Sequence, residues 1–294
     1  MSIKDMIGNL GISEKASRVC DTLAPVITQI LPVQHTCTSD TTPTFTATAI
    51  DGVSEVNESS YEWIPYTNGV AGTTVITGNT YTFSTLQHDD KVYVRVRVRD
   101  NLGHTSMYNT SYNYTIDIAG PEAPQSLNPA NGYNTNDSTP TFSWDKPVDV
   151  GCNGVVDHYV ISIYSDQNCM DAIKTNITSN ENFTTYLSDG IYYWRVKAVD
   201  GFGNNGPWSA CMQITIDTQL PNTPELKYPQ DNLCVTQPIT LEWNETTDAG
   251  PSGVYYYNVQ VDTDSSFVSP VKDNITSNTV SYTHLRAHET RHDL

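Results

Sequence analysis

Aspartates are the side chains of this chain whose positions most suggest chemistry, because they recur near the ends of predicted strands. Ca²⁺ takes about six to eight oxygen ligands from converging carboxylates and carbonyls, so calcium binding is one hypothesis. The alternative is that each aspartate caps a turn and keeps a loop soluble. No other cofactor is expected. The calcium candidates are Asp100, Asp117, Asp200, Asp217, Asp262 and Asp264.

Six cysteines offer a second kind of chemistry. No two of them form a Cys-x-x-Cys pair, so a zinc site is not expected. An even number without metal spacing favours disulfides and therefore an oxidising compartment, outside the cell or at its surface. The disulfide candidates are Cys20, Cys37, Cys152, Cys169, Cys211 and Cys234.

Catalytic motifs are absent from the sequence. It contains no Gly-rich phosphate loop, no G-x-S-x-G and no H-E-x-x-H. The histidines His35, His88, His104 and His158 are scattered. Paired carboxylates occur in any acidic chain and therefore do not by themselves indicate a catalytic site. The sequence therefore predicts no catalytic residue and no enzymatic activity.

Charge and hydropathy restrict the partners. With 33 acidic and 15 basic residues, the formal net charge is −18. Nucleic acid and anionic membranes are disfavoured, because phosphate binding needs a basic face. No run of about 18 apolar residues is present, so no membrane insertion is expected. A protein or a glycan at a cell surface is the expected partner.

Modification and aromatic recognition are further hypotheses. Trp208 is expected to stack on Arg195 and Lys197, a structural cation–π contact rather than a ligand site. The run from Tyr255 to Tyr257 could offer a platform for sugar, or could be ordinary strand chemistry. Asn-x-Ser/Thr sequons mark glycosylation candidates if a glycosylating cell secretes the chain. They begin at Asn57, Asn109, Asn113, Asn136, Asn176, Asn182, Asn244 and Asn274.

A repeat of about one hundred residues positions all of these side chains. Residues 191–217 contain an alternating strand, a Gly-bounded turn and a second strand, and residues 94–117 follow the same plan. Valines at 94, 96 and 98 alternate with arginines, which indicates a strand with one buried and one solvated face. The expected organisation is the tail of a preceding repeat at 1–22, then repeats at 23–118, 119–218 and 219–279.

The two ends of the chain have their own interpretations. A short helix at 3–16 is the alternative to a repeat tail at the N-terminus. The stretch VSYTHLRAHET within 280–294 resembles a translated sequencing adapter and is expected to be non-native. His284 and His288 in this stretch have the i, i+4 spacing of metal ligands on a helix, a less favoured alternative. The third repeat is therefore expected to lack its last strands and to expose an unpaired edge.

The second repeat resembles the fibronectin type III module. Trp144, then Tyr159-x-Ile-x-Ile, then Tyr192-x-Trp-x-Val-x-Ala carry the likeness, and the third repeat shares its first half. The resemblance implies all-β, tandem antiparallel sandwiches of two sheets each, the last truncated. In the first repeat Ala47 replaces the Trp, so a looser immunoglobulin-like sandwich is expected, with Trp63 refilling the core. The expected core residues are Phe45, Trp63, Phe142, Trp144, Tyr159, Tyr192, Trp194, Val196, Trp243 and Tyr257.

Placed on this fold, the cysteines suggest a pairing. We expect Cys20 with Cys37, Cys152 with Cys169, and Cys211 with Cys234, among the fifteen connectivities that six cysteines allow. The functional expectation is a fragment of a multi-repeat extracellular or cell-surface protein that acts as a structural stalk or an adhesion module. The alternative is a set of accessory, non-catalytic modules of a secreted carbohydrate-active or proteolytic hydrolase. Both are inferences by analogy, because this fold hosts many unrelated tasks.

Overall fold

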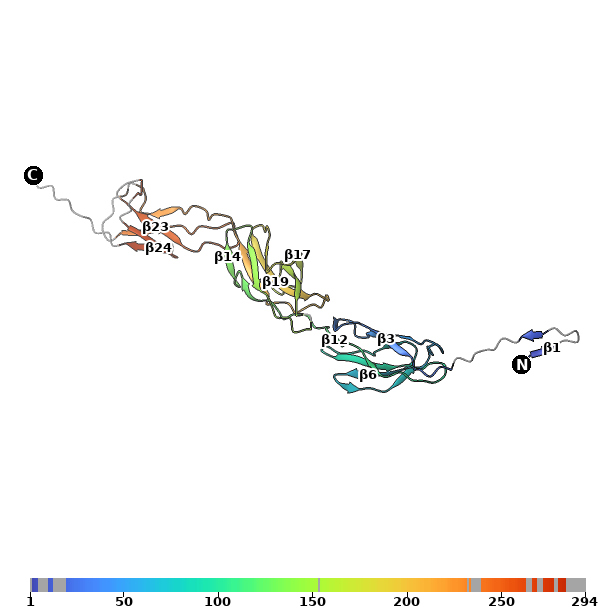
Figure 1. Cartoon of the computed structure of the whole chain (residues 1–294). Coiled ribbons are helices and arrows are strands. Elements are labelled where there is room, and N and C mark those ends of the chain that lie inside the picture. The colour runs from blue at the N-terminus through green and yellow to red at the C-terminus, as the bar shows by residue number, and fades with distance from the viewer. Residues whose placement is uncertain are drawn as a thin grey trace, which may run out of the picture. The chain divides into compact units, whose positions relative to one another are not determined.

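The computed structural model describes residues 2–4, 10–12, 20–152, 154–231, 233, 239–262, 266–268, 272–277 and 280–283. In this part of the chain every regular element is a strand (Figure 1). The chain divides into two compact units. One contains residues up to Pro121 with the loops Asp149–Val155 and Asp200–Asn204, and the other contains the remainder.

The first sandwich has the immunoglobulin-like arrangement of two sheets, with neighbours antiparallel except for the parallel pair β4–β12. One sheet has the order β3-β5-β9, with strands at Val26–Leu31, Thr44–Ile50 and Thr80–Thr82. The other has the order β4-β12-β10-β6-β7, with strands at Thr36–Thr38, Tyr114–Ile116, Lys91–Arg97, Tyr61–Thr67 and Val70–Ala71. Two short strands flank it, β8 (Val75–Thr77) on β6 and β11 (Asn109–Thr110) on β10.

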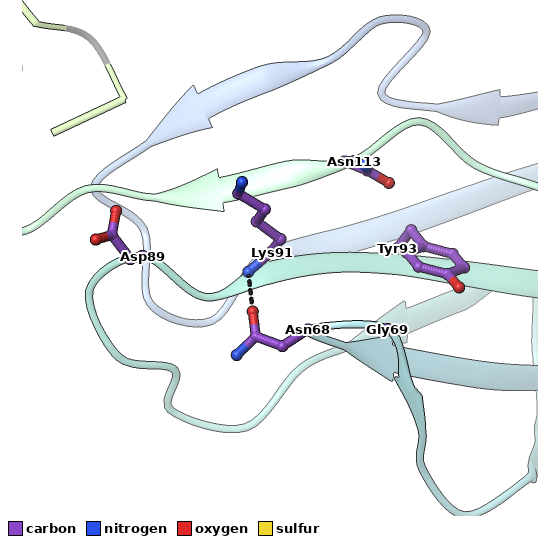
Figure 2. A pocket seen from close by; sticks show the side chains of 6 residues that line it. All are labelled: Asn68, Gly69, Asp89, Lys91, Tyr93 and Asn113. Carbon is purple, nitrogen blue, oxygen red and sulfur yellow. Dashed lines mark hydrogen bonds between the residues drawn. The ribbon is translucent and has the colours of Figure 1, made fainter.

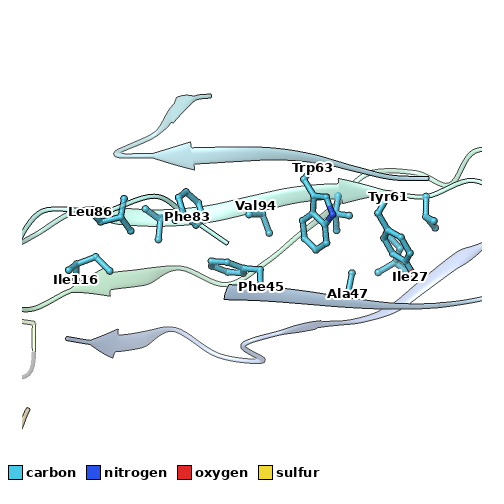
Figure 3. Packing of buried hydrophobic residues seen from close by; sticks show 12 residues of the cluster. Ile27, Phe45, Ala47, Tyr61, Trp63, Phe83, Leu86, Val94 and Ile116 are labelled. Atoms are coloured by element: carbon cyan, nitrogen blue, oxygen red, sulfur yellow. The ribbon is translucent and has the colours of Figure 1, made fainter. Parts of the chain in front are cut away.

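The core of the first sandwich lies between these sheets (Figure 3). Val92, Val94 and Val96 of β10 face inward and are fully buried, as their alternation predicts. Trp63 and Ala47 are also fully buried, and Figure 3 shows Trp63 reaching across the interior from β6. The indole Nε1–H of Trp63 donates to the carbonyl of Gly78 at 3.0 Å. Trp63 and Ala47 belong to one core cluster, which is consistent with the expectation that Trp63 refills the core.

The second sandwich contains the residues that carry the family resemblance. Its three-stranded sheet has the order β13-β15-β18, with strands at Gln125–Asn128, Thr141–Asp145 and Asn182–Thr184. Its five-stranded sheet has the order β14-β20-β19-β16-β17, with strands at Tyr133–Thr135, Met212–Ile216, Gly190–Asp200, Val156–Tyr164 and Ala172–Thr178. Phe142, Trp144, Tyr159, Trp194 and Val196 are buried in one cluster, and Tyr192 is half-buried against it.

The third group of strands is smaller. Strands β21 (Leu226–Tyr228), β22 (Ile239–Trp243) and β25 (Val280–Thr283) form one sheet, and β23 (Tyr257–Val261) pairs with β24 (Lys272–Thr276). Trp243 and Tyr257 are buried with ring centroids 5.5 Å apart. In the described part of this group, no strand takes the place that β19 and β20 hold in the second sandwich. The domain boundaries and the adapter interpretation stay predictions.

At the N-terminus, β1 (Ser2–Lys4) pairs with β2 (Leu10–Ile12) in antiparallel register. The alternative of a helix over residues 3–16 is therefore wrong for the residues described there. Gly8 and Gly11 lie within residues 3–16, and glycine in a helix interior is unfavourable, which accounts for the failure of the helix interpretation.

Candidate functional site

Asp100 and Asp200 occupy the same place in the two sandwiches, and each organises a turn. The Oδ1 of Asp100 accepts the backbone N–H groups of Leu102 and His104, both at 2.8 Å, and its Oδ2 lies 2.6 Å from His104 Nδ1. In the same way, the Oδ1 of Asp200 accepts hydrogen bonds from the backbone N–H groups of Phe202 and Asn204. Burial raises the pKa of Asp100, but the hydrogen bonds from His104 and its neighbours outweigh this and lower it to about 2.

Three further aspartates, Asp21, Asp117 and Asp217, stand where one repeat leads into the next, and we call them the joint aspartates. Asp217 accepts the backbone N–H of Gln219 at 3.0 Å and that of Ser252 at 2.9 Å, and also the hydroxyl of Ser252. Asp21 accepts the N–H groups of Leu23 and Ser54, both at 3.0 Å. Hydrogen bonds, chiefly from Ser252 and from Ser54, lower the pKa of Asp217 and of Asp21 respectively.

The loops that pack against Asp117 and Asp217 each contain a closely packed glycine. A Cβ on Gly151 would lie 2.1 Å from Oδ2 of Asp117, and one on Gly250 would lie 1.8 Å from Oδ1 of Asp217. No side chain fits at such distances without displacing the carboxylate. Asn204 also donates to the carbonyl of Asp117 at 3.0 Å. A packed contact between a joint aspartate and a loop glycine therefore recurs at Asp117 and Asp217, whereas a Cβ on Gly52, in the loop that binds Asp21, would meet no atom within 4 Å.

These contacts bear on the calcium hypothesis. Ligand atoms of Asp21, Asp100 and His104 lie within 4.8 Å of one another, which is close enough for a cation. However, the carboxylate of Asp100 already accepts N–H groups of its own turn, and that of Asp21 accepts the N–H groups of Leu23 in its own turn and of Ser54 in a distant loop. The turn-capping alternative accounts for this arrangement. Asp262 is half-buried, and Asp264 lies outside the described residues. Calcium binding stays an untested alternative to turn capping.

The structure pairs the cysteines differently from the expectation. Cys37 is bonded to Cys152 and Cys169 to Cys211, whereas Cys20 is free and exposed and Cys234 lies outside the described residues. All three expected pairs are therefore wrong.

Closeness in sequence does not determine which cysteines meet, because the fold brings distant loops and strands together. The Cα atoms of Cys37, on the edge strand β4, and of Cys152, in the loop before β16, are 5.9 Å apart. In the loop after β16, the carboxylate of Asp166 accepts the backbone N–H groups of three residues and so stabilises a turn. Cys169 lies in this turn, is fully buried and is bonded to Cys211.

The sequons occupy different environments. Asn57, Asn113 and Asn176 are half-buried, and the amide oxygen of Asn57 already accepts its own Ser59 hydroxyl at 2.8 Å. No side-chain position is described for Asn274. The exposed sequon asparagines are Asn109, Asn136, Asn182 and Asn244.

The expected cation–π stack is confirmed on the outer face of the second sandwich. Arg195 Cζ lies 4.6 Å and Lys197 Nζ 5.0 Å from the ring of Trp208. The first sandwich has an equivalent in Arg97, which lies 4.5 Å from the ring of Tyr108 and forms an ion pair with Glu62 at 2.8 Å. Tyr257 is buried and Tyr256 is exposed, as their alternation predicts.

A polar pocket on the first sandwich was missed by the sequence argument. It has a volume of about 640 Å³ and is lined by Asn68, Gly69, Asp89, Lys91, Tyr93 and Asn113 (Figure 2). We call it the outer-face pocket, because Lys91 and Tyr93 are outward-facing residues of β10. Two signals were visible in the sequence, the Asn-Gly turn at 68–69 and outward tyrosines at 66 and 93. Their proximity depends on the pairing of β6 with β10.

Comparison with known proteins concerns the fold. No family model matches the chain. The crystal structure of chicken CNTN1 FN1-FN3 domains is 16% identical, with 89% of this chain and 87% of that chain covered and a TM-score of 0.32. Clostridium thermocellum CbhA fibronectin(III)-like modules are 10% identical over 65% and 93%, with a TM-score of 0.30. Titin domains A168-A170 are 12% identical over 65% and 67%, with a TM-score of 0.40.

These values support no functional inference. The class of fold follows from the strand order described above: the chain consists of tandem antiparallel β-sandwiches of fibronectin type III and immunoglobulin-like architecture. The part of the chain that the structure describes contains no helix of the length and apolarity needed to cross a membrane.

Proposed function

We propose that the chain is a non-catalytic segment of a multi-repeat extracellular or cell-surface protein, in which the sandwiches act as a structural stalk and adhesion module. The observation that carries the proposal is the Cys37–Cys152 disulfide, which spans 115 positions of sequence. Disulfides persist in oxidising compartments and are rare in the cytosol. Its two half-cystines belong to different predicted repeats, so the bond joins successive repeats covalently.

Two of the joint aspartates support the same role. Asp21 ends one repeat and accepts the N–H groups of Leu23 and Ser54 in the next, and Asp217 likewise accepts those of Gln219 and Ser252. Contacts of this kind are not needed for the core of either sandwich. They are useful in a protein whose repeats have to keep their connection under tension.

The pattern of disulfides also determines which residues carry tension. When the two ends of the chain are pulled apart, force passes from Cys37 to Cys152 through the sulfur atoms. Residues 38–151, which contain most of the first sandwich, are then excluded from the path. In the same way, the Cys169–Cys211 disulfide removes residues 170–210 of the second sandwich from the path of the force.

Location at the cell surface is tested with antibodies against residues 20–218. We expect them to label intact cells of the source organism. Labelling only after permeabilisation would place the chain in the cell interior and overturn the proposal. Sequencing of the whole reading frame gives an independent outcome, because a catalytic domain in the same frame would favour accessory modules of a hydrolase.

A further inference from the structure

We propose that the outer-face pocket binds a neutral, hexose-containing glycan, with the ring of Tyr93 as the stacking surface. The proposal deepens the adhesion role proposed above and rests on it. It names the first sandwich as the part of the chain that contacts the partner and a glycan as the chemical class of that partner.

The pocket contains a rigid aromatic surface. Tyr93 of β10 and Tyr66 of β6 are paired in register and stack with ring centroids 4.5 Å apart and planes at 7°. Both point away from the core, because Val92 and Val94 beside Tyr93 and Pro65 beside Tyr66 are buried. A hexose has one face of C–H groups that packs on an aromatic ring, while its hydroxyl groups remain available for hydrogen bonds. The ring of Tyr66 covers one face of the Tyr93 ring. Tyr93 and Asn113 both line the pocket.

Polar groups surround this surface. Asp89, Lys91 and Asn113 all line the pocket, and Figure 2 shows Lys91 between Asp89 on one side and Asn113 and Tyr93 on the other. None of the ion pairs found among the described residues involves Lys91, so its ammonium group has no carboxylate bound to it. An ammonium, a carboxylate and an amide together supply donors and acceptors. Neighbouring sugar hydroxyls need both, because each hydroxyl donates one hydrogen bond and accepts others.

The rim is held in place before any ligand arrives. The Oδ1 of Asn68 accepts the backbone N–H of Lys91 at 2.9 Å, and its Nδ2 donates to Asp90 at 2.7 Å. Asn68 and Gly69 both have positive φ, 51° and 80°, which is typical of a tight Asn-Gly hairpin turn. A preorganised rim reduces the entropy cost of binding.

Charge favours a neutral ligand. Asp89 lines the pocket together with Lys91, and the whole chain has a net charge of −18. A polyanion would therefore be repelled. The Tyr255–Tyr257 run is a poorer platform, because the rings of Tyr255 and Tyr256 meet at 68° and share no flat surface.

The sequon at Asn113 adds a condition. A glycan attached to Asn113 would occupy the pocket, so binding of an external glycan requires this residue to be unmodified. For the binding experiment, the chain is therefore expressed in cells that lack N-glycosylation. A Thr115→Val variant from glycosylating cells, which has lost this sequon, is expected to bind as well as the unmodified chain.

The test uses the full chain on an array of neutral and acidic glycans, followed by calorimetric titration of the free oligosaccharides that bind. Binding to neutral glycans is expected, and Tyr93→Ala should weaken it by about tenfold or more. Tyr133→Ala, which removes a half-exposed tyrosine from the second sandwich, is the matched control and should bind like the unaltered chain.

Folding of each variant is checked by its thermal transition. If Tyr93→Ala does not fold, Asn113→Ala replaces it, and the same loss is expected. No binding to any neutral glycan, or equal affinity after these substitutions, would overturn the proposal. Such a result would leave surface labelling of intact cells unaffected, so the failure of this inference is distinct from failure of the proposed function.

Discussion

Gly151 packs directly against the carboxylate of Asp117, where a Cβ at position 151 would lie 2.1 Å from Oδ2. Gly151→Ala should therefore force the loop and Asp117 apart and destabilise the first unit by about 1–3 kcal/mol. For a domain of this size each kcal/mol lowers the Tm by about 4–8 °C. Differential scanning calorimetry of the full chain measures this shift.

Gly52→Ala is the matched control. Gly52 lies in the corresponding region of the first repeat, but a Cβ there would meet no atom within 4 Å. Its Tm should change little. If both substitutions had the same effect, the contact with Asp117 would not be the cause.

The aromatic core of the second sandwich gives a second prediction. Trp194 is fully buried, and its ring centroid lies 4.9 Å from that of Phe142. Trp194→Ala should cost about 3–5 kcal/mol, because it removes a large buried side chain and leaves a cavity. Chemical denaturation followed by circular dichroism measures the loss. Tyr186→Ala, at a residue that is 66% exposed, should leave the transition almost unchanged.

The amount of structure that could be predicted from the sequence differs among these features. Alternation along Val92–Arg97 and around Trp194 is a local pattern, so the inward faces were predictable. The cysteine pairing was not, because it depends on a loop folding back from β16 to Cys211. The outer-face pocket likewise depends on the register between Tyr66 and Tyr93, which no local pattern specifies.

Acid should destabilise the first unit through Asp100. Its folded pKa is about 2, below the ordinary value of 3.8, so the carboxylate contributes stability above pH 4 that is lost as the pH falls toward 2. The Tm should fall over this range in thermal melts. In an Asp100→Asn variant the Tm at pH 7 should be lower and the fall smaller. A fall of equal size in the variant would assign the acid sensitivity to other groups.

Chelation tests the calcium hypothesis against turn capping. The oxygens of Asp100 accept N–H groups within its own turn, and those of Asp21 accept the N–H groups of Leu23 and of the distant Ser54, so hydrogen bonding accounts for their positions without an ion. We therefore expect EDTA to leave the Tm of the chain unchanged. A fall of several degrees that added Ca²⁺ reverses would establish a bound cation.

Force-extension measurement on single molecules tests the proposed tension path most directly. The two disulfides prevent stretches of 115 and 42 sequence positions from being extended when the ends of the chain are pulled. At about 3.5 Å per extended residue, these correspond to about 400 Å and about 150 Å of chain. Full unfolding of the oxidised chain should therefore release about 550 Å less length than unfolding of the reduced chain. Equal lengths in the two states would contradict the account.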